Sequence, residues 1–336
     1  MFSQLMPKLF YRNFVIGYFL PITLFFSALI GYFSFVVKDN SIILFIKEDL
    51  LVRTIFLGLV FWFGGLLLVA INGFLIRFLE GYYYFPWKNK LTNRHKRRFK
   101  ELQDFLSDWK EKYKSNDPNI KKKAEQKMTE AIEKELIISE RFPDSDNWIM
   151  ATKFGNSIRA FEVYPRVMYG IDSVLSWNRI VAVMPEDFRE IIDNAKANVD
   201  FWVNLLVLAL IFGMIVFGLY ISGISWQGIG FFYSFLVSTL VPTVTMLILV
   251  IFFLFCYYRA IEASVEWGDW VKTAFDIYLP KLASSLELEL PTSRTDERKF
   301  WMEFSQAITY RNPEVLPNRK TRAGVVQPEN PAPPDV

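Results

Sequence analysis

The chain has 336 residues, of which 52% are hydrophobic and 17% aromatic, and its formal net charge is +3 at pH 7. The hydrophobic share is above that of ordinary soluble domains, so the length alone does not indicate two or three such domains. The single cysteine, Cys256, excludes a disulfide within the chain. The positions of the apolar residues therefore decide the fold class.

Apolar residues gather in four clusters, at about residues 14–37, 54–78, 201–224 and 229–258. Each is long enough for the roughly 20 residues with which a helix crosses about 30 Å of hydrocarbon. The first is too long for the core of a signal peptide and is followed by Lys38-Asp39-Asn40 instead of a small-residue cleavage pattern. The sequence predicts an all-α integral membrane protein, with four transmembrane helices and a mainly helical cytoplasmic module.

The charges that flank these clusters predict the orientation. The densest basic run, Lys88 to Lys100, follows the second cluster, and basic residues next to spans stay in the cytoplasm. The loop between spans one and two is balanced in charge, and the loop from Ser222 to Gly228 carries no charge, as suits the outer face. We therefore expect a multi-pass protein of the cell membrane, with both termini in the cytoplasm. In a bacterium this membrane would be the cell inner membrane.

The expected organisation has five parts. Amphipathic spacing and a break at Ser115-Asn116-Asp117-Pro118 predict a helical hairpin of two charged helices after span two. A helix that opens near Glu186 is expected to continue into span three, and span four is expected to extend past Arg259. The predicted parts are transmembrane helices 1 and 2 (1–87), the hairpin with a Gly-, Pro- and aromatic-rich module (88–200), transmembrane helices 3 and 4 (201–258), a cytoplasmic helical extension (259–311) and a disordered, proline-rich tail (312–336).

Polar residues inside the spans are candidates for a pore lining. Asn72, Arg77 and Glu80 lie near the inner end of span two, and ionisable residues at such positions usually face a cavity or a partner. Alternatively, Arg77 reaches the headgroups and pairs with Glu80. Thr239 and Thr243 flank a proline in span four, which predicts either a kink that opens a pore or a bent packing helix.

A second group of polar residues lies in the cytoplasmic module. It comprises Asn156, Arg159, Glu162, Tyr164 and Asp172. Such a group is typical of a site for a small polar ligand or of a coupling between the module and the spans. Alternatively, it is an internal polar network that fixes a turn, because buried charges need partners.

The same stretch resembles an uncharacterised family of bacterial polytopic membrane proteins. The resemblance rests on Gly155-Asn156, Arg159-Ala160-x-Glu162-x-Tyr164-Pro165 and Tyr169-Gly170-x-Asp172, together with the four-span layout. It implies a shared fold and no activity. The layout is also broadly similar to that of bestrophin anion channels, as an analogy of topology only.

Catalytic and metal-binding patterns are missing from the sequence. His95 is the single histidine and lies in the basic run, and no zinc set, nucleophile elbow or phosphate-binding glycine loop occurs. A carboxylate pair such as Glu162 and Asp172 is still a candidate for acid–base chemistry. We expect no enzyme, no cofactor and no metal. Because the basic run Lys88–Lys100 adjoins a span, we expect it to meet anionic lipid headgroups and not nucleic acid.

Three classes of function remain open. The first is a homo-oligomeric ion channel or pore-forming protein. The second is a membrane-anchored sensor or scaffold, whose cytoplasmic module binds a ligand or a cytoplasmic protein partner. The third, a transporter subunit, is disfavoured because the sequence has no inverted repeat.

Overall fold

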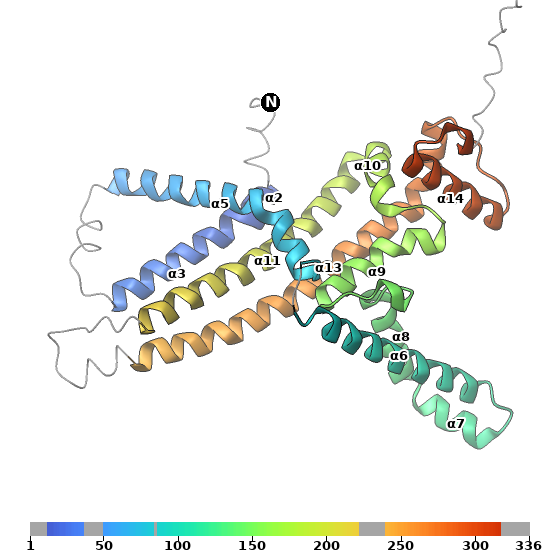
Figure 1. Cartoon of the computed structure of the whole chain (residues 1–336), viewed down its shortest axis with the longest axis horizontal. Helices are drawn as coiled ribbons and strands as arrows, with labels where there is room; N and C mark the ends of the chain where they lie inside the picture. The colour runs from blue at the N-terminus through green and yellow to red at the C-terminus, as the bar shows by residue number, and fades with distance from the viewer. Residues whose placement is uncertain (1–11, 37–49, 84–85, 222–238, 317–336) are drawn as a thin grey trace, which may run out of the picture. The chain divides into compact units, whose positions relative to one another are not determined.

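The fold is built from helices and contains no β-sheet in the part of the chain that the computed structural model describes (Figure 1). The described residues are 12–36, 50–83, 86–221 and 239–316. The chain divides into two compact units, Met1–Tyr164 with Pro185–Lys272, and Pro165–Met184 with Thr273–Val336. The predicted disordered tail after residue 316 and most of the two predicted outer loops lie outside the described residues.

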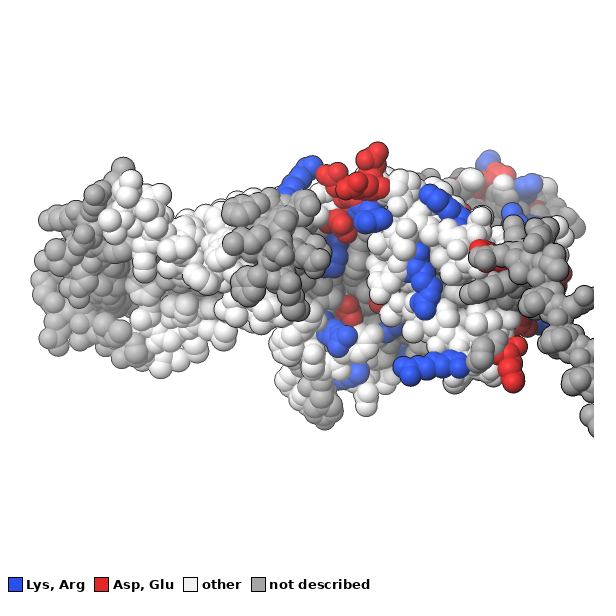
Figure 2. Space-filling model, turned by 90° about the horizontal axis from the view of Figure 1, so that it is seen from above, with Lys and Arg blue, Asp and Glu red and all other residues white. Residues whose placement is uncertain are grey.

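Four helical segments are long and apolar enough to cross a membrane, as predicted. They comprise α2 (Arg12–Phe14) with the π-helical turn η2 (Val15–Phe19) and α3 (Leu20–Val36), then α5 (Leu50–Glu80), α11 (Glu186–Ile221) and α13 (Val241–Ser285). On the face that Figure 2 shows, most of the described length of these spans is white. This agrees with the sequence, which has no Lys, Arg, Asp or Glu at 13–37, 54–76 or 201–258.

Helix α11 is the most enclosed of the four spans. In its most apolar eighteen residues 44% are buried, against 11% in α5 and in α13. It packs against α3 through a core of Ile22, Leu68 and Leu208, and it meets α13 where Leu206 contacts Cys256. As predicted, α11 runs unbroken from Glu186 into the third span and α13 extends the fourth span to Ser285.

The predicted hairpin is present and has three helices. These are α6 (Lys88–Tyr113), α7 (Pro118–Gln126) and α8 (Met128–Arg141). Asp117 caps α7 by accepting a 2.8 Å hydrogen bond from the amide of Asn119. The second predicted helix is divided at Lys127, and this break allows Ala124 and Ala131 both to be buried in the hairpin, where α7 and α8 each pack on α6.

The module that follows is also helical, although its sequence is rich in glycine and proline. A 3₁₀ turn, η3 (Asp146–Trp148), leads into α9 (Lys153–Met168). Helix α9 packs on α13, where the hydroxyls of Ser157 and Ser264 are 2.6 Å apart. Gly268 of α13 faces the ring of Phe161, so the two helices approach closely.

The second unit has its own aromatic core. It contains α10 (Ser173–Val183), the end of α13, α14 (Arg294–Tyr310) and the 3₁₀ turn η5 (Pro313–Val315). Trp301, Phe275 and Ile180 are fully buried there. Gly170 has φ +83°, and a side chain at this position would collide with the carbonyl of Arg298, so glycine is needed before α10 begins.

Candidate functional site

The main candidate site is a carboxylate buried among three spans. Asp200 of α11 is 3% exposed. One of its oxygens accepts hydrogen bonds from the Tyr18 hydroxyl at 2.7 Å and from Lys196 Nζ at 2.8 Å. The other accepts from Asn72 Nδ2 at 3.0 Å and from Lys196 Nζ at 2.9 Å. We call Tyr18, Asn72, Lys196, Asp200 and Asn204 the Asp200 cluster.

The first span reaches the Asp200 cluster through its π-helical turn. In this turn the amide of Leu20 donates to the carbonyl of Val15, five residues back. Gly17 lies so close to α11 that an added Cβ would be 3.4 Å from both the Ala197 carbonyl oxygen and Asp200 Cβ. Its carbonyl accepts a 2.8 Å hydrogen bond from Asn204 Nδ2. Such π-turns are rare and often occur at functional sites.

The depth of the Asp200 cluster follows from its neighbours along the chain. Arg12, Arg77 and Arg259 mark one end of the apolar lengths, which we call the charged end. Tyr18 comes six residues after Arg12, and Asn72 five residues before Arg77. At about 1.5 Å per residue, the cluster lies roughly 8 Å inside these arginines.

The electrostatics of the Asp200 cluster combine a buried anion with a cation that water can reach. The Lys196 side chain is 36% exposed and that of Asp200 only 5%. A buried carboxylate is tolerated only when its oxygens are fully hydrogen-bonded, as they are here. Ionisable groups at this depth in a span pair with each other and mark ion or proton pathways.

Two amide oxygens of the Asp200 cluster are buried without a hydrogen-bond donor among the described residues. They are Asn72 Oδ1 and Asn204 Oδ1. The nitrogens of both amides are bonded, and these bonds fix which end of each amide is the oxygen. Amide and carboxylate oxygens together are suitable ligands for a hydronium ion or another small hard cation.

A second cluster joins the end of α5 to the start of α9. The Thr152 hydroxyl donates to the Leu79 carbonyl at 2.6 Å and accepts from the Gly155 amide at 2.8 Å. Arg159 pairs with Glu162 at 3.0 Å and donates to the Tyr82 hydroxyl. Burial raises the pKa of that hydroxyl, and the charge of Arg159 opposes the rise.

The residues predicted for span two therefore separate into two places. Asn72 belongs to the Asp200 cluster. Glu80 is 8% exposed, and it is close enough to Arg159 and Glu162 to interact with their charges. Among the described residues no ion pair within 4.0 Å joins Glu80 to Arg77, so the predicted Arg77–Glu80 pair is absent, although Arg77 is close enough to act on Glu80 through its charge.

The other predicted residues have local structural roles. Asn156 closes the loop before α9, since its Oδ1 accepts from the Met150 amide at 2.7 Å. Tyr164 has Lys272 Nζ at 5.9 Å from its ring centre. Asp172 belongs to the second unit, where it caps α10 by accepting from the Leu175 amide at 3.0 Å.

One threonine hydroxyl of span four bonds to the backbone close to Pro242. The Thr243 hydroxyl donates to the Thr239 carbonyl at 2.7 Å. The Thr243 side chain is exposed in the single chain. The two alternatives for this proline, a kink that opens a pore and a bent packing helix, both stay predictions.

Comparison with known proteins does not assign a function to this chain. No family model, characterised protein or solved structure matches this chain. A helical fold by itself implies no function. The residues that form the site must therefore carry the assignment.

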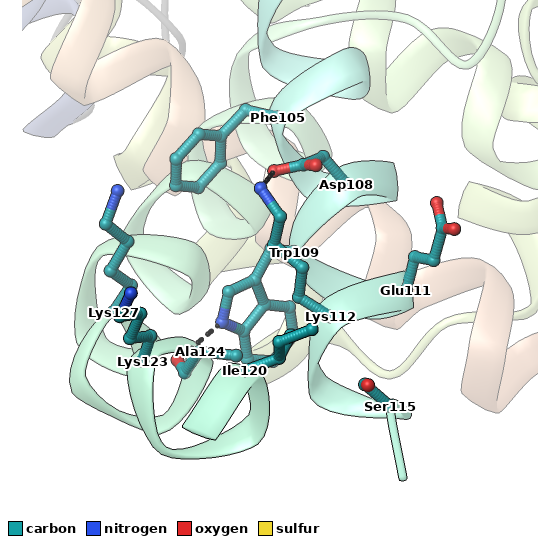
Figure 3. Close-up of a pocket in the computed structure, with 10 residues that line it drawn as sticks. All are labelled: Phe105, Asp108, Trp109, Glu111, Lys112, Ser115, Ile120, Lys123, Ala124 and Lys127. Carbon is teal, nitrogen blue, oxygen red and sulfur yellow. Dashed lines mark hydrogen bonds and ion pairs between the residues drawn. The ribbon is translucent and has the colours of Figure 1, made fainter. Parts of the chain in front are cut away.

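A groove of about 720 Å³ lies on the hairpin, outside the spans. Figure 3 shows the Trp109 ring beside Ala124, with its indole nitrogen donating to the Ala124 carbonyl at 2.9 Å. Charged side chains of both signs line the rim, among them Asp108 and Lys112, which pair with each other at 2.7 Å. The groove is amphipathic and has no charge of a single sign to select a small ion.

Sequence reasoning missed Tyr18, Lys196, Asp200 and Asn204. One signal was available, because Asp200 is the last charged residue before the charge-free stretch 201–258 and has Lys196 four residues earlier on the same helical face. The contact with Tyr18 had no signal, since it depends on the π-helical turn. The turn rotates the first span and cannot be read from an apolar run.

Removing the Tyr18 hydroxyl tests the Asp200 cluster without removing its charge. We expect Tyr18→Phe to lower the free energy of unfolding by about 1–2 kcal/mol, because one hydrogen bond to a charged group is lost. Tyr258→Phe is the matched control, since Tyr258 is 55% exposed. Titration of the detergent-solubilised protein with a denaturing detergent, followed by tryptophan fluorescence, measures both. Equal values for the two variants would contradict the hydrogen bond.

Proposed function

We propose that the chain is an ion-conducting membrane protein that acts as a homo-oligomer, and that a small cation passes the Asp200 cluster. The observation that carries the proposal is the buried Asp200 carboxylate, held by four hydrogen bonds inside three apolar helices. A dry structural contact between apolar helices needs no charge, and burying one costs several kcal/mol. A cation pathway would explain why a charged residue is present at this depth in the spans.

The Asp200 cluster has the parts that a cation or proton pathway needs. Lys196 lies on the side of the charged end and is partly exposed. Asn72 Oδ1 and Asn204 Oδ1 are acceptors without donors among the described residues. A proton can move along the hydroxyl of Tyr18 and the carboxylate of Asp200, which are 2.7 Å apart. These groups favour a proton or an alkali cation over an anion.

The proposed homo-oligomer is supported by the exposed apolar faces of the spans. The groove between α11 and α13 is lined by apolar side chains such as Leu210, Met214 and Phe253. Most of α5 and of the membrane-spanning part of α13 is not covered within the chain. In an oligomer these faces would contact neighbouring copies, and the charged end would face the cytoplasm.

Conductance and mass together test the proposal. The purified protein should form a defined homo-oligomer and give discrete currents in a planar lipid bilayer. Asn72→Leu removes one ligand of the Asp200 cluster and should change the unitary conductance. Glu190→Gln, an exposed position near the start of α11, should not. A monomer that gives no current would contradict the proposal.

A second candidate function, a membrane-anchored sensor or scaffold, is favoured by the hairpin. Ile132 and Leu136 on α8 are each 53% exposed, and the groove beside Trp109 is close to them in the hairpin. Exposed apolar side chains on a charged helix are typical of a surface that binds a protein partner. This candidate predicts spans that pack without conducting, together with a monomer or dimer.

A further inference from the structure

A basic cavity lies where α6, the loop before α9 and the end of span four meet. Its volume is about 790 Å³. All of its lining residues belong to the first unit. The side chains that matter here are those of Arg94, His95, Arg97, Arg98, Lys153 and Tyr257. None of them belongs to the Asp200 cluster, so the cavity is separate from the proposed conduction site.

The charge of this basic cavity is poorly compensated. Its one acidic residue, Glu101, pairs with Arg98 at 3.5 Å. Arg94, Arg97 and Lys153 have no ion pair within 4.0 Å among the described residues, whereas many lysines elsewhere on the hairpin do, such as Lys110 with Glu135. Several cations that converge on one cavity without acids attract an anion.

The position of the basic cavity restricts the anion to one near a membrane surface. Tyr257 comes two residues before Arg259, at the end of the charge-free stretch of span four. Its hydroxyl lies against the backbone amides of Lys153 and Phe154, at the start of α9. Leu91 adds an exposed apolar side chain to the rim. The cavity thus has an apolar side toward the span and a cationic side toward the hairpin.

We propose that this cavity binds the phosphodiester headgroup of an anionic phospholipid. Arginine forms paired hydrogen bonds with phosphate oxygens, and Arg94 and Arg97 are the two arginines without an acidic partner. Basic pockets at the ends of spans are suited to such headgroups. This proposal goes further than attraction of the run Lys88–Lys100 to a membrane, because it adds Lys153 and Tyr257 from other elements and requires a defined stoichiometry.

His95 makes the binding depend on pH. Burial lowers its pKa, and the nearby charges of Lys153 and Arg94 lower it further. His95 is therefore neutral at pH 7 in the free protein. The other groups that face it in the cavity are Arg97, Arg98 and Glu101. A bound phosphodiester favours protonated His95, so affinity should rise as the pH falls from 7 into the acidic range in which His95 gains its proton, and His95→Gln should remove that rise.

Native mass spectrometry of the detergent-solubilised full chain tests the proposal. The probes are phosphatidylglycerol and, as a neutral lipid, phosphatidylcholine. The double variant Arg94→Gln with Arg97→Gln should weaken phosphatidylglycerol binding about 25-fold, since each basic residue near the headgroup contributes roughly fivefold. The control is Lys121→Gln with Lys122→Gln, which removes the same charge from exposed positions of α7 and should change binding less than twofold.

Three outcomes would overturn the assignment. The first is binding of phosphatidylglycerol that is unchanged in the arginine double variant. The second is an equal loss in the lysine control, which would make the attraction a general effect of net charge. The third is saturable binding of glycerol phosphate or inorganic phosphate without binding of the lipid, which would assign the cavity to a soluble phosphate compound.

Discussion

Replacing Asp200 by asparagine is expected to lower the free energy of unfolding by about 2–3 kcal/mol. Asparagine offers one acceptor oxygen and one donor nitrogen in place of two acceptor oxygens. The nitrogen would face donors that now bind the carboxylate, from Lys196 and either Asn72 or Tyr18. The loss stays below that of a fully buried pair because the Lys196 side chain, 36% exposed, can turn to water.

The unfolding midpoint in a denaturing detergent, read by tryptophan fluorescence, measures this loss. The matched control is Glu190→Gln, which also replaces a carboxylate by an amide on α11, at an exposed position. We expect this control to lie within about 0.5 kcal/mol of the unchanged protein. If Asp200→Asn lowered the free energy of unfolding by no more than this control, the carboxylate would not hold the three spans together.

Placing alanine at Gly155 is the second change for which we expect a large effect. An added Cβ would collide with the backbone carbonyl of Glu80 and would lie 2.9 Å from the Thr152 hydroxyl oxygen. These neighbours cannot easily move, because the Thr152 hydroxyl is bonded to the Leu79 carbonyl at the end of α5. We expect Gly155→Ala to lower the free energy of unfolding by about 2–3 kcal/mol.

Gly213→Ala provides a control with the opposite expected sign. Gly213 lies within α11, and an added Cβ there would meet no atom within 4 Å. Alanine should stabilise that helix by about 0.5–1 kcal/mol, because glycine loses more backbone freedom on folding. The same detergent titration compares the two variants. A loss of similar size in both would mean that the α5–α9 contact does not depend on Gly155.

The spans could be predicted from the sequence because their signal is local. About twenty apolar residues without charge have few structural alternatives to a membrane-spanning helix. The same holds for the hairpin, where the structure confirms the predicted break at 115–118: α6 ends at Tyr113, and α7 begins at Pro118 with Asp117 as its cap. The helical extension predicted for 259–311 is interrupted after Ser285, and α14 begins at Arg294. The burial of its core residue Trp301 depends on contacts within the second unit, which the sequence pattern does not show.

The site could be predicted only in part because its residues come from distant segments. Asn72 was recognised as polar within an apolar run, but the choice of Asp200 as its partner depends on how α5 and α11 are rotated. Arg159 and Glu162 are three residues apart, and their ion pair follows from helical spacing. Asp172 was grouped with them by sequence proximity, yet it caps a helix of the second unit.

Cation flux into proteoliposomes tests the central claim most directly. We predict proton or alkali-cation flux for the unchanged protein and for Glu190→Gln, and at least a tenfold loss for Asp200→Asn in an oligomer of unchanged mass. Where Asp200→Asn does not assemble, Tyr18→Phe takes its place and should reduce the flux severalfold. Unchanged flux in a correctly assembled Asp200→Asn variant, or no flux in the unchanged protein, would contradict a cation pathway through the Asp200 cluster.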